Sequence, residues 1–399
     1  MRILLSTFAF ALYTPPMDFY DLDGLLTPDE IAIRKKARAF AEQEIIPLAA
    51  AYWAKAEFPT QIIPKLATLN WCGGSIQGYG CPGLSHVALG LIGMELARGD
   101  ASISTFFAIT SGLAMGSIAL CGSEEQKARW LPPMARMEAI GAFGLTEPDV
   151  GSDASHITTI ARKDGDAYIL NGAKKWIGNA TFADVTVIWA QDEQTGKVSG
   201  FLVEKDTPGF SATPMQDKIS LRMLINAHIK LENCRVPVAN KLADAQSFKD
   251  TARVLRATRF GVAWEAIGHA VAAYDLALTY AKERQQFGRS IAQFQMIQDK
   301  LVRMLAEVET LKLMGWRLSK LADAGKLTEG QSSLAKVHCC CRAREVVALG
   351  RELMGGNGIL LKHHMARHFV DMESIYTYEG TNEINTLIVG REITGLSAF

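Results

Sequence analysis

An excess of charge of either sign is lacking in this chain of 399 residues, in which 42 lysines and arginines balance 42 aspartates and glutamates. Without a basic surplus we expect neither a nucleic-acid footprint nor a polybasic membrane patch. The seven cysteines also lack a regular spacing, and three of them, Cys339, Cys340 and Cys341, are consecutive. On a helix their side chains point about 100° apart, so they cannot jointly hold one metal ion. We interpret them as reduced thiols and expect an intracellular protein of the bacterial cytoplasm.

A complete targeting signal is also lacking. Residues 3–13 are apolar and follow a single Arg2, but no A-x-A cleavage site comes after them. We expect an extension or an upstream start codon before Met17 rather than a secretion signal. Residues 101–123 contain no charged side chain and are long enough to cross a bilayer. Because this stretch is rich in Ser, Thr and Gly and has amphipathic helices on both sides, we predict a buried helix and no membrane insertion.

Motifs for a dinucleotide and for a metal ion are incomplete. Residues 78–83, GYGCPG, match G-x-G-x-x-G, but no parallel strand precedes them and no βαβ unit follows, so we predict a loop between helices. His364 and His368 are four residues apart with Asp371 nearby, a spacing that suits a metal pair. No H-E-x-x-H accompanies them, and His363 beside them favours a solvated face, so we predict no metal site.

The order of local patterns predicts three regions. Thr27-Pro28-Asp29-Glu30 is typical of a helix start, and helical periodicity continues to about residue 139. A β-rich block follows, with turn signals at Asp164-Gly165, Asn171-Gly172 and Thr195-Gly196 and strand-like runs ADVTVIWA, GFLVEK and HIKLENCRV. Helical patterns then return. Because the strands do not alternate with helices, we predict an α+β fold with regions 17–139, 140–242 and 243–399.

Three glycine-containing segments suit a cofactor that carries phosphates. Residues 144–155, GLTEPDVGSDAS, lack the acid spacing of a calcium loop but offer hydroxyls and free backbone to a heterocycle, and Trp176 adds an aromatic plane. RQQFG at 284–288 and ELMGGNGI at 352–359 supply a fixed cation and bare amides, which suit a pyrophosphate. For both, a plain helix C-cap is the alternative. Arg256 and Arg259 face either a second phosphate or solvent.

Residues 375–383, IYTYEGTNE, crowd one carboxylate, Glu379, between apolar neighbours and Gly380. Burial there would raise the pKa of Glu379 and suit it to take a proton. The alternative is a surface loop whose acid faces water.

In this order, the motifs resemble those of the acyl-CoA dehydrogenase family over about residues 18–399. GLTEPDVGSD, RQQFG, ELMGGNGI and YEGT carry the resemblance. WIGN, GRELMGGNGIL and YTYEGTNEINTLIVGREITG are most similar to the glutaryl-CoA dehydrogenase branch and to plant short-chain acyl-CoA oxidases. The resemblance implies an N-terminal helical domain, a middle β-barrel domain and a C-terminal helical bundle.

The resemblance also implies the chemistry. Glu379 would remove the α-proton of a short- or branched-chain acyl-CoA thioester, and the flavin N5 of FAD would take the β-hydride, giving the trans-2-enoyl-CoA. The backbone N–H of Glu379 and a flavin hydroxyl would bind the thioester oxygen, with Gly380 leaving room. Electrons would pass to an electron-transferring flavoprotein, and in the alternative of an acyl-CoA oxidase they would pass to oxygen. A non-catalytic acyl-CoA-binding protein is a third reading.

The matching motifs imply which residues bind each ligand. FAD would contact Phe143, Leu145, Thr146, Ser152, Trp176, Ile177 and Gly178. The FAD of a neighbouring subunit in a homotetramer would contact Arg284, Phe287, Gln295, Glu352, Leu353, Met354, Gly355 and Gly356, with Thr381 and either Asn382 or Glu383 completing the site. The acyl-CoA would contact Ser104, Thr105, Ser152, Arg256, Arg259 and Gly380.

Two departures from the family pattern bear on the substrate. Glutaryl-CoA dehydrogenases carry an Arg for the distal carboxylate and a Glu one turn earlier, where this chain has Ser104 and Ala97. A diacid would leave its far carboxylate buried without a partner, so we disfavour glutaryl-CoA and expect neutral surroundings at Ser104. Gly178 stands where most dehydrogenases have Thr or Ser, and it keeps only a backbone donor, as in the plant oxidases.

Overall fold

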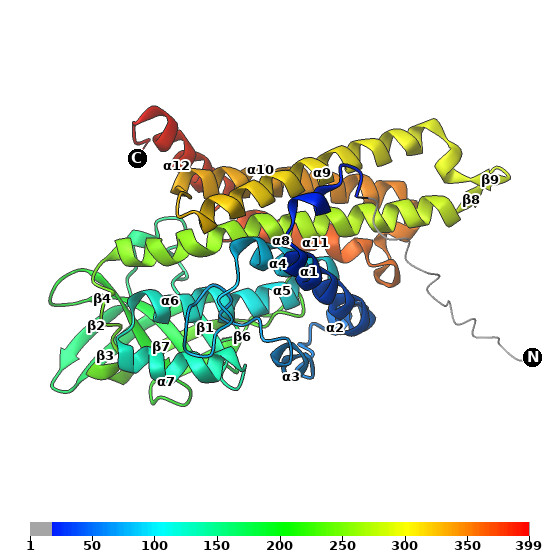
Figure 1. Cartoon of the computed structure of the whole chain (residues 1–399). Helices are drawn as coiled ribbons and strands as arrows, with labels where there is room; N and C mark the ends of the chain where they lie inside the picture. Colours follow the sequence, from blue (N-terminus) through cyan, green and yellow to red (C-terminus); the bar gives the residue numbers. More distant parts are fainter. Residues whose placement is uncertain (1–17, 399) are drawn as a thin grey trace, which may run out of the picture.

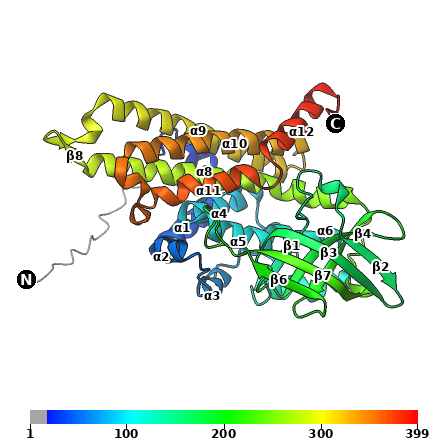
Figure 2. The same ribbon diagram turned by 180° about the vertical axis from the view of Figure 1, so that it is seen from behind.

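The computed structural model describes residues 18–398, so the apolar stretch at residues 3–13 lies outside the described part. Strands gather at one end of a long helical body, and a small hairpin marks the other end (Figure 1). The view from behind shows the same division (Figure 2). The helical, sheet and helical order predicted from the sequence is therefore confirmed.

The first region is helical. Its helices are α1 (Pro28–Phe40), α2 (Ile46–Lys55), α3 (Ile62–Ala67), α4 (His86–Gly99), α5 (Ala101–Ala108), α6 (Met115–Cys121) and α7 (Glu124–Ala135). The predicted start at Thr27 is confirmed, because its hydroxyl accepts from the Glu30 N–H and the Glu30 carboxylate accepts from the Thr27 N–H. GYGCPG lies in the loop between α3 and α4, as predicted.

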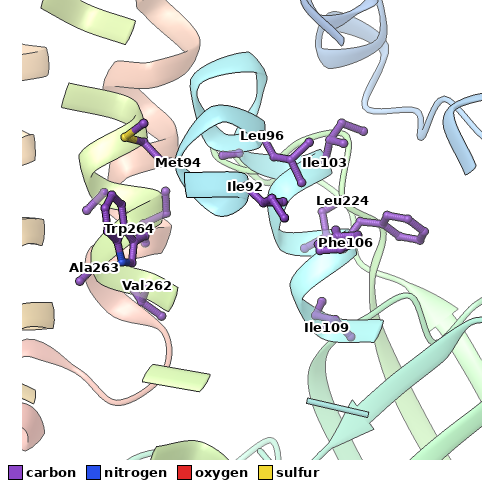
Figure 3. Close-up of a cluster of buried hydrophobic side chains, with 14 of the residues drawn as sticks. Ile92, Met94, Leu96, Ile103, Phe106, Ile109, Leu224, Val262, Ala263 and Trp264 are labelled. Atoms are coloured by element: carbon purple, nitrogen blue, oxygen red, sulfur yellow. The ribbon is translucent and has the colours of Figure 1, made fainter. Parts of the chain in front are cut away.

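The uncharged run forms α5, the π-helix η3 (Ile109–Ala114) and α6 in continuous succession. Residues Ala101–Cys121 are long and apolar enough to span a membrane, yet 56% of the most apolar window is buried inside the protein. α5 packs against α4 and α8 and carries Ile103 and Phe106 into the shared core (Figure 3). The run therefore belongs to the core of the helical body.

The second region is one curled seven-stranded sheet. Its strands are β1 (Gly141–Gly144), β2 (Ile160–Asp164), β3 (Ala167–Gly178), β4 (Val185–Asp192), β5 (Val198–Glu204), β6 (Phe210–Pro214) and β7 (Asn226–Pro237). They run in the order β1-β4-β2-β3-β7-β6, with β5 on the other edge of β4. Along β4, Val187 and Trp189 join the helical core while Ile188 and Ala190 join a separate core within the sheet. β4 is thus buried on both faces, one against the helices and one inside the curled sheet.

One predicted turn is wrong. Asp164-Gly165 and Thr195-Gly196 do lie between strands, but Asn171-Gly172 lies inside β3. The pairing with β7 shifts register between Leu170 and Gly172, and Asn171 makes side-chain hydrogen bonds with Asn233 on β7. The glycine serves a β-bulge, where φ is 148° and a Cβ would lie 2.8 Å from the Thr159 Cα. An Asn-Gly pair such as Asn171-Gly172 is therefore a sequence signal for a β-bulge as well as for a turn.

The third region contains α8 (Phe248–Glu283), α9 (Gln295–Asp323), α10 (Glu329–Leu353), α11 (Met365–Thr377) and α12 (Asn382–Thr394), with the hairpin strands β8 (Gln285–Gln286) and β9 (Arg289–Ser290). With 36 residues, α8 is about 54 Å long. It reaches from the sheet to the hairpin (Figure 1), and it packs against α4, α5, α9, α10 and α11. α8 is therefore the common wall of the helical body.

Candidate active site

The loop between α11 and α12 holds Glu379 in a fixed position. Glu379 has a left-handed backbone with φ 56°, and Gly380 follows with φ 86°. The buried Lys336 amine on α10 donates to the carbonyls of Tyr376 and Gly380, each at 2.7 Å. The Asn385 amide on α12 also donates to the Gly380 carbonyl at 2.7 Å. Because a non-glycine residue keeps a positive φ only where its surroundings hold it, these bonds fix the direction of the Glu379 side chain.

The Glu379 carboxyl group lies beside Thr258 on α8, whose Oγ1 is 3.4 and 3.5 Å from its two oxygens. Burial raises the pKa of Glu379 above 4.5, against the charges of Arg259 and Lys336 and the hydrogen bond from Thr258. Within the described residues, no group accepts a hydrogen bond from the Glu379 backbone N–H. A desolvated base and an unused amide donor therefore lie on one residue, and the alternative of an acid facing open water is not supported.

The two arginines predicted to bind substrate point in different directions. Arg256 is exposed on α8. Arg259 is buried against α10, where its Nη1 lies 3.2 Å from the Ser333 hydroxyl and 3.6 Å from a Glu329 carboxylate oxygen. Arg259 thus faces the helix bundle beside Glu379, and Arg256 is the one of the pair that an approaching ligand can reach.

Several predicted cofactor residues gather where β1 and β3 end. Phe143, Leu145 and Thr146 lie in or after β1, and Trp176, Ile177 and Gly178 end β3. The Lys175 N–H donates to the Thr146 carbonyl at 2.8 Å, so the two segments lie side by side. Trp176 is 52% exposed, and Ser152 is exposed in the loop that follows. An open indole face beside backbone and hydroxyl donors fits a flat heterocycle.

A buried ion pair fixes the loop after β1. The Lys174 amine is 2.8 Å from a Glu147 oxygen and donates to the Leu145 carbonyl at 3.0 Å. The Glu147 carboxylate also accepts from the N–H and hydroxyl groups of Thr158 and Thr159. Burial alone would raise the pKa of Glu147, but the Lys174 charge and these hydrogen bonds lower it to about 2. Glu147 therefore has a structural role, because its carboxylate is already bonded to Lys174, Thr158 and Thr159.

Gly178 has no room for a side chain. A Cβ there would lie 2.4 Å from the Cδ1 of Ile109, the first residue of η3. A Thr or Ser at this position would require Ile109 to move, so only the backbone can serve a ligand here.

A second group of predicted cofactor residues lies at the far end of α8. Arg284 caps α8, Phe287 in the hairpin is 92% exposed, and Gln295 begins α9. In the turn after α10, Leu353 and Met354 are buried, whereas Cβ atoms added at Gly355 and Gly356 would meet nothing within 4 Å. Glu352 is exposed and pairs with Lys300 at 3.1 Å. The Asn357 amide of this turn donates to the Tyr280 hydroxyl on α8 at 2.9 Å, so the turn lies at the same end of α8 as Arg284. Open glycine backbone and an exposed guanidinium at this end fit a pyrophosphate.

The length of α8 separates these two groups, whereas Thr381 and Glu383 lie near Glu379. Thr381 is the N-cap of α12, with its hydroxyl accepting from the Ile384 N–H at 3.3 Å, and Glu383 is exposed in the first turn. One chain therefore cannot bring both groups of predicted FAD residues to the same FAD molecule.

The reading of His368 and Asp371 as a solvated face is wrong. Both are buried, and the His368 Nδ1 lies 2.8 Å from the Nδ1 of His269 on α8. The Asp371 carboxylate accepts from the Leu221 N–H at 2.7 Å. In residues 18–398, no group of three or more His, Cys, Asp or Glu side chains is placed to hold a metal ion. The spacing marks the buried face of α11 packing on α8.

The sequence analysis missed two buried charged residues near Glu379. Lys336 is one, and Glu265 on α8 is the other. Glu265 is 5% exposed, and its two oxygens accept from the Ser104 hydroxyl at 2.8 Å and from the Tyr378 hydroxyl. The surroundings of Ser104 therefore include a buried acid, which the expectation of neutral surroundings did not foresee. A lone acid in the apolar run FGVAWEAIG was the available signal for Glu265.

The fold and this site define a flavin-dependent oxidoreductase. Models of the N-terminal, middle and C-terminal domains of acyl-CoA dehydrogenases match residues 27–138, 142–234 and 248–394. The chain belongs to the acyl-CoA dehydrogenase family, whose members bind FAD and act on acyl-CoA thioesters.

Relatives cover nearly the whole chain. The mitochondrial short-chain specific acyl-CoA dehydrogenase of Rattus norvegicus is 33% identical over 90% of this chain and 88% of its own length. A glutaryl-CoA dehydrogenase from Mycobacterium smegmatis, solved with FADH2, is 37% identical over 96% of this chain and 99% of its own, with a TM-score of 0.94. Butyryl-CoA dehydrogenase from Megasphaera elsdenii is 31% identical over 92% of this chain and 98% of its own, with a TM-score of 0.89.

Proposed function

We propose that this protein is an FAD-dependent acyl-CoA dehydrogenase that converts a short- or branched-chain acyl-CoA to the trans-2-enoyl-CoA. The observation that carries the proposal is Glu379 itself. Its carboxylate is desolvated and fixed by its loop, and its own N–H has no partner within the described residues. A base for the α-proton and a donor for the thioester oxygen are thus held on one residue.

The chain's own residues bind, orient and deprotonate the substrate. The thioester oxygen accepts from the Glu379 N–H, which makes the α-proton more acidic by stabilising the enolate. The Glu379 carboxylate takes that proton, while Thr258 and the left-handed backbone keep it aimed at the α-carbon. FAD, held by the residues around Trp176, supplies the acceptor for the β-hydride. The acyl chain extends from Glu379 toward Ser104 and Thr105 on α5.

A homotetramer built from dimers completes the cofactor site in this proposal. One group of FAD residues lies beside η3, whose Gly112 approaches Thr258 on α8, and the other lies beyond Glu283 at the C-terminal end of the same helix, so by the rise of an α-helix roughly 40 Å of α8 separates them. The exposed Phe287 and the open Gly355 and Gly356 of one chain would then meet the FAD of its neighbour. A closed symmetric assembly joins the two half-sites.

The electron acceptor in this proposal is an electron-transferring flavoprotein. The second candidate is an acyl-CoA oxidase, favoured by Gly178, where Ile109 fills the space of the missing side chain. Purified protein turning over butyryl-CoA in air, with no acceptor added, separates the two. Stoichiometric hydrogen peroxide would establish the oxidase, and turnover that requires the flavoprotein would establish the dehydrogenase.

The substrate we propose is a monoacyl chain of butyryl or isobutyryl size. Ser104 and Ala97 supply no cation for a distal carboxylate, and Ala97 is buried where α4 crosses α8, next to Gly268. A methylene changes discrimination by about 1–3 kcal/mol, whereas an unpaired buried charge has a larger effect. We expect kcat/KM for butyryl-CoA to exceed that for glutaryl-CoA by at least about 10²-fold, roughly 2.7 kcal/mol.

The E379Q variant tests the proposed base. The amide keeps the shape and loses the proton acceptor, so turnover should fall by at least about 10²–10⁴-fold while FAD content and acyl-CoA binding persist. Because burial raises the pKa of Glu379 above 4.5, kcat/KM of the unmodified protein should fall toward acid along a limb that begins above pH 4.5. Near-normal turnover by E379Q would refute the assignment.

A further inference from the structure

Glu265 is a buried acid that the proposed reaction does not use. It lies on α8 between Trp264 and Ala266, where α8 faces α4 and α5; Figure 3 shows Trp264 and its neighbours Val262 and Ala263 in this packing. Within residues 18–398 no Lys or Arg forms an ion pair with Glu265, whose side-chain partners are the Ser104 and Tyr378 hydroxyls. A buried carboxyl group without a cation is costly unless something else satisfies it. An apolar side chain would serve the core better, so packing alone does not account for Glu265.

The position of Glu265 relates it to the base. It follows Thr258, which contacts Glu379, by seven residues, so the two side chains share one face of α8 about 10 Å apart along the helix. Its partner Tyr378 directly precedes Glu379. Its other partner, Ser104 on α5, is the residue toward which the acyl chain is proposed to extend. Glu379, Tyr378 and Glu265 are therefore connected in succession, from the proposed position of the reacting carbons toward the proposed end of the acyl chain.

The cluster has hydrogen-bonding capacity left over. A carboxylate offers about four lone-pair sites, and Ser104 and Tyr378 use two. The neighbouring Thr105 hydroxyl is buried close to the Tyr378 hydroxyl, but within the described residues it meets no partner at full hydrogen-bonding geometry. A buried hydroxyl without a hydrogen-bond partner is energetically unfavourable, so the missing partner of Thr105 suggests a bound ligand. Burial raises the pKa of Glu265 to about 7, the bonds from Tyr378 and Ser104 oppose the rise, and the Glu379 charge adds to it.

Resting on the acyl-CoA dehydrogenation proposed above, we propose that Glu265 determines specificity at the far end of the acyl site. With Ser104 and Thr105, it binds an acyl chain that carries a hydroxyl group near its end and rejects a chain that ends in a carboxylate. A chain hydroxyl donates to the free lone pairs of Glu265 and accepts from Thr105. A terminal carboxylate meets a second acid and no cation.

The test compares butyryl-CoA, 4-hydroxybutyryl-CoA and glutaryl-CoA as substrates of the FAD-loaded protein. In the unmodified protein, kcat/KM for the hydroxyacyl chain should exceed that for butyryl-CoA by at least about tenfold, mainly through KM. In E265L the ratio of kcat/KM for the hydroxyacyl chain to that for butyryl-CoA should fall to about one, whatever the change in butyryl-CoA turnover itself. In E265Q, which keeps the shape and removes the charge, the rejection of glutaryl-CoA should weaken by at least about tenfold. D275N, at another buried acid of the same helix, is the matched control and should leave every ratio unchanged.

Failure of this inference and failure of the proposed function are distinguishable. Turnover of butyryl-CoA with the same substrate ratios in E265L, E265Q and the unmodified protein would overturn the role of Glu265 and leave the dehydrogenase intact. If no thioester is oxidised, the proposed function fails, and equilibrium affinities of the three thioesters then test Glu265 by the same ratios. Should E265L fail to fold, S104A, which removes one of the two donors that hold Glu265, should still reduce the hydroxyl advantage, and an unchanged ratio would again overturn the role.

Discussion

At the scale of the residue, the site depends on charges that the protein buries for a purpose other than ion pairing. The Lys336 amine is surrounded by α10 and the loop before α12, and burial lowers its pKa below the ordinary 10.5. The amine donates hydrogen bonds to the carbonyls of Tyr376 and Gly380, on either side of Glu379 in sequence, and not to a carboxylate. Lys336 therefore acts as a positioning residue, because it sets where the base points and also keeps a positive charge close to it.

Replacing Lys336 by Met should loosen this loop. The Tyr376 carbonyl loses its partner, and a buried unpaired carbonyl costs about 1–3 kcal/mol of the free energy of unfolding. Because the direction of Glu379 is no longer fixed, kcat should fall by about tenfold or more, with KM changing less. Urea unfolding and steady-state kinetics measure the two effects, and K326M, at an exposed lysine after α9, is the control. Unchanged kcat in a destabilised K336M protein would show that Lys336 is structural only.

At the scale of the element, the segments that follow β1 and end β3 are joined by the Glu147–Lys174 pair. The folded-state pKa of Glu147, about 2, is below its ordinary 4.5. A depressed carboxyl pKa adds stability that is present above the unfolded value and is lost as the pH falls through the folded value. This pair should therefore contribute to the cofactor loop at neutral pH and release it in acid.

The E147Q variant should show both sides of this linkage. At pH 7 it leaves Lys174 buried without its partner, so the free energy of unfolding should fall by about 3–5 kcal/mol. Between pH 4.5 and 2 the unmodified protein should lose stability more steeply than E147Q, because only it takes up a proton at Glu147 on unfolding. Denaturant unfolding across this pH range measures the slopes. E193Q, at an exposed acid in the turn between β4 and β5, should follow the unmodified protein, and parallel slopes for E147Q would contradict the argument.

Elements were more predictable from the sequence than their contacts. The helix start at Thr27 and the strand β4 follow from caps and apolar runs, which are local signals. Gly172 carried the signal of a turn but serves a bulge, because the Thr159 backbone that it approaches in the fold is distant from it along the sequence. Glu265 and Lys336 could not be placed by spacing, since their partners come from α5, α11 and the loop before α12. Glu379 could be predicted as a candidate base because its apolar neighbours adjoin it in sequence, whereas the polar neighbours of Glu265 do not adjoin that residue.

At the scale of the whole molecule, α8 is long enough to take part in two different sites. Thr258 near one end contacts the base, and Arg284 at the other end belongs to the exposed group that includes Phe287. The sequence motifs predict the FAD residues around Trp176 and those around Arg284, but they do not give the distance between the two groups. That distance is what makes a second copy of the chain necessary to the proposed cofactor site.

Replacing Arg284 by Ala should weaken FAD retention and tetramer assembly together. The side chain is exposed, so the folded monomer should lose at most about 0.5 kcal/mol. Gel filtration after dilution, with flavin absorbance recorded across the peak, measures both properties, and K282A, at an exposed residue two positions earlier, is the control. Full flavin content in an intact tetramer of R284A would place this arginine outside the cofactor site.

The reach of α8 has a consequence for heredity. If each active centre takes its base from one chain and its pyrophosphate contacts from another, two inactive alleles can restore each other. A chain with E379Q and a chain with R284A, mixed at random, form mixed pairs in about half of all dimers, and each mixed pair contains one centre with both parts intact. About a quarter of the normal activity should return, although one parent chain lacks the base and the other retains FAD poorly.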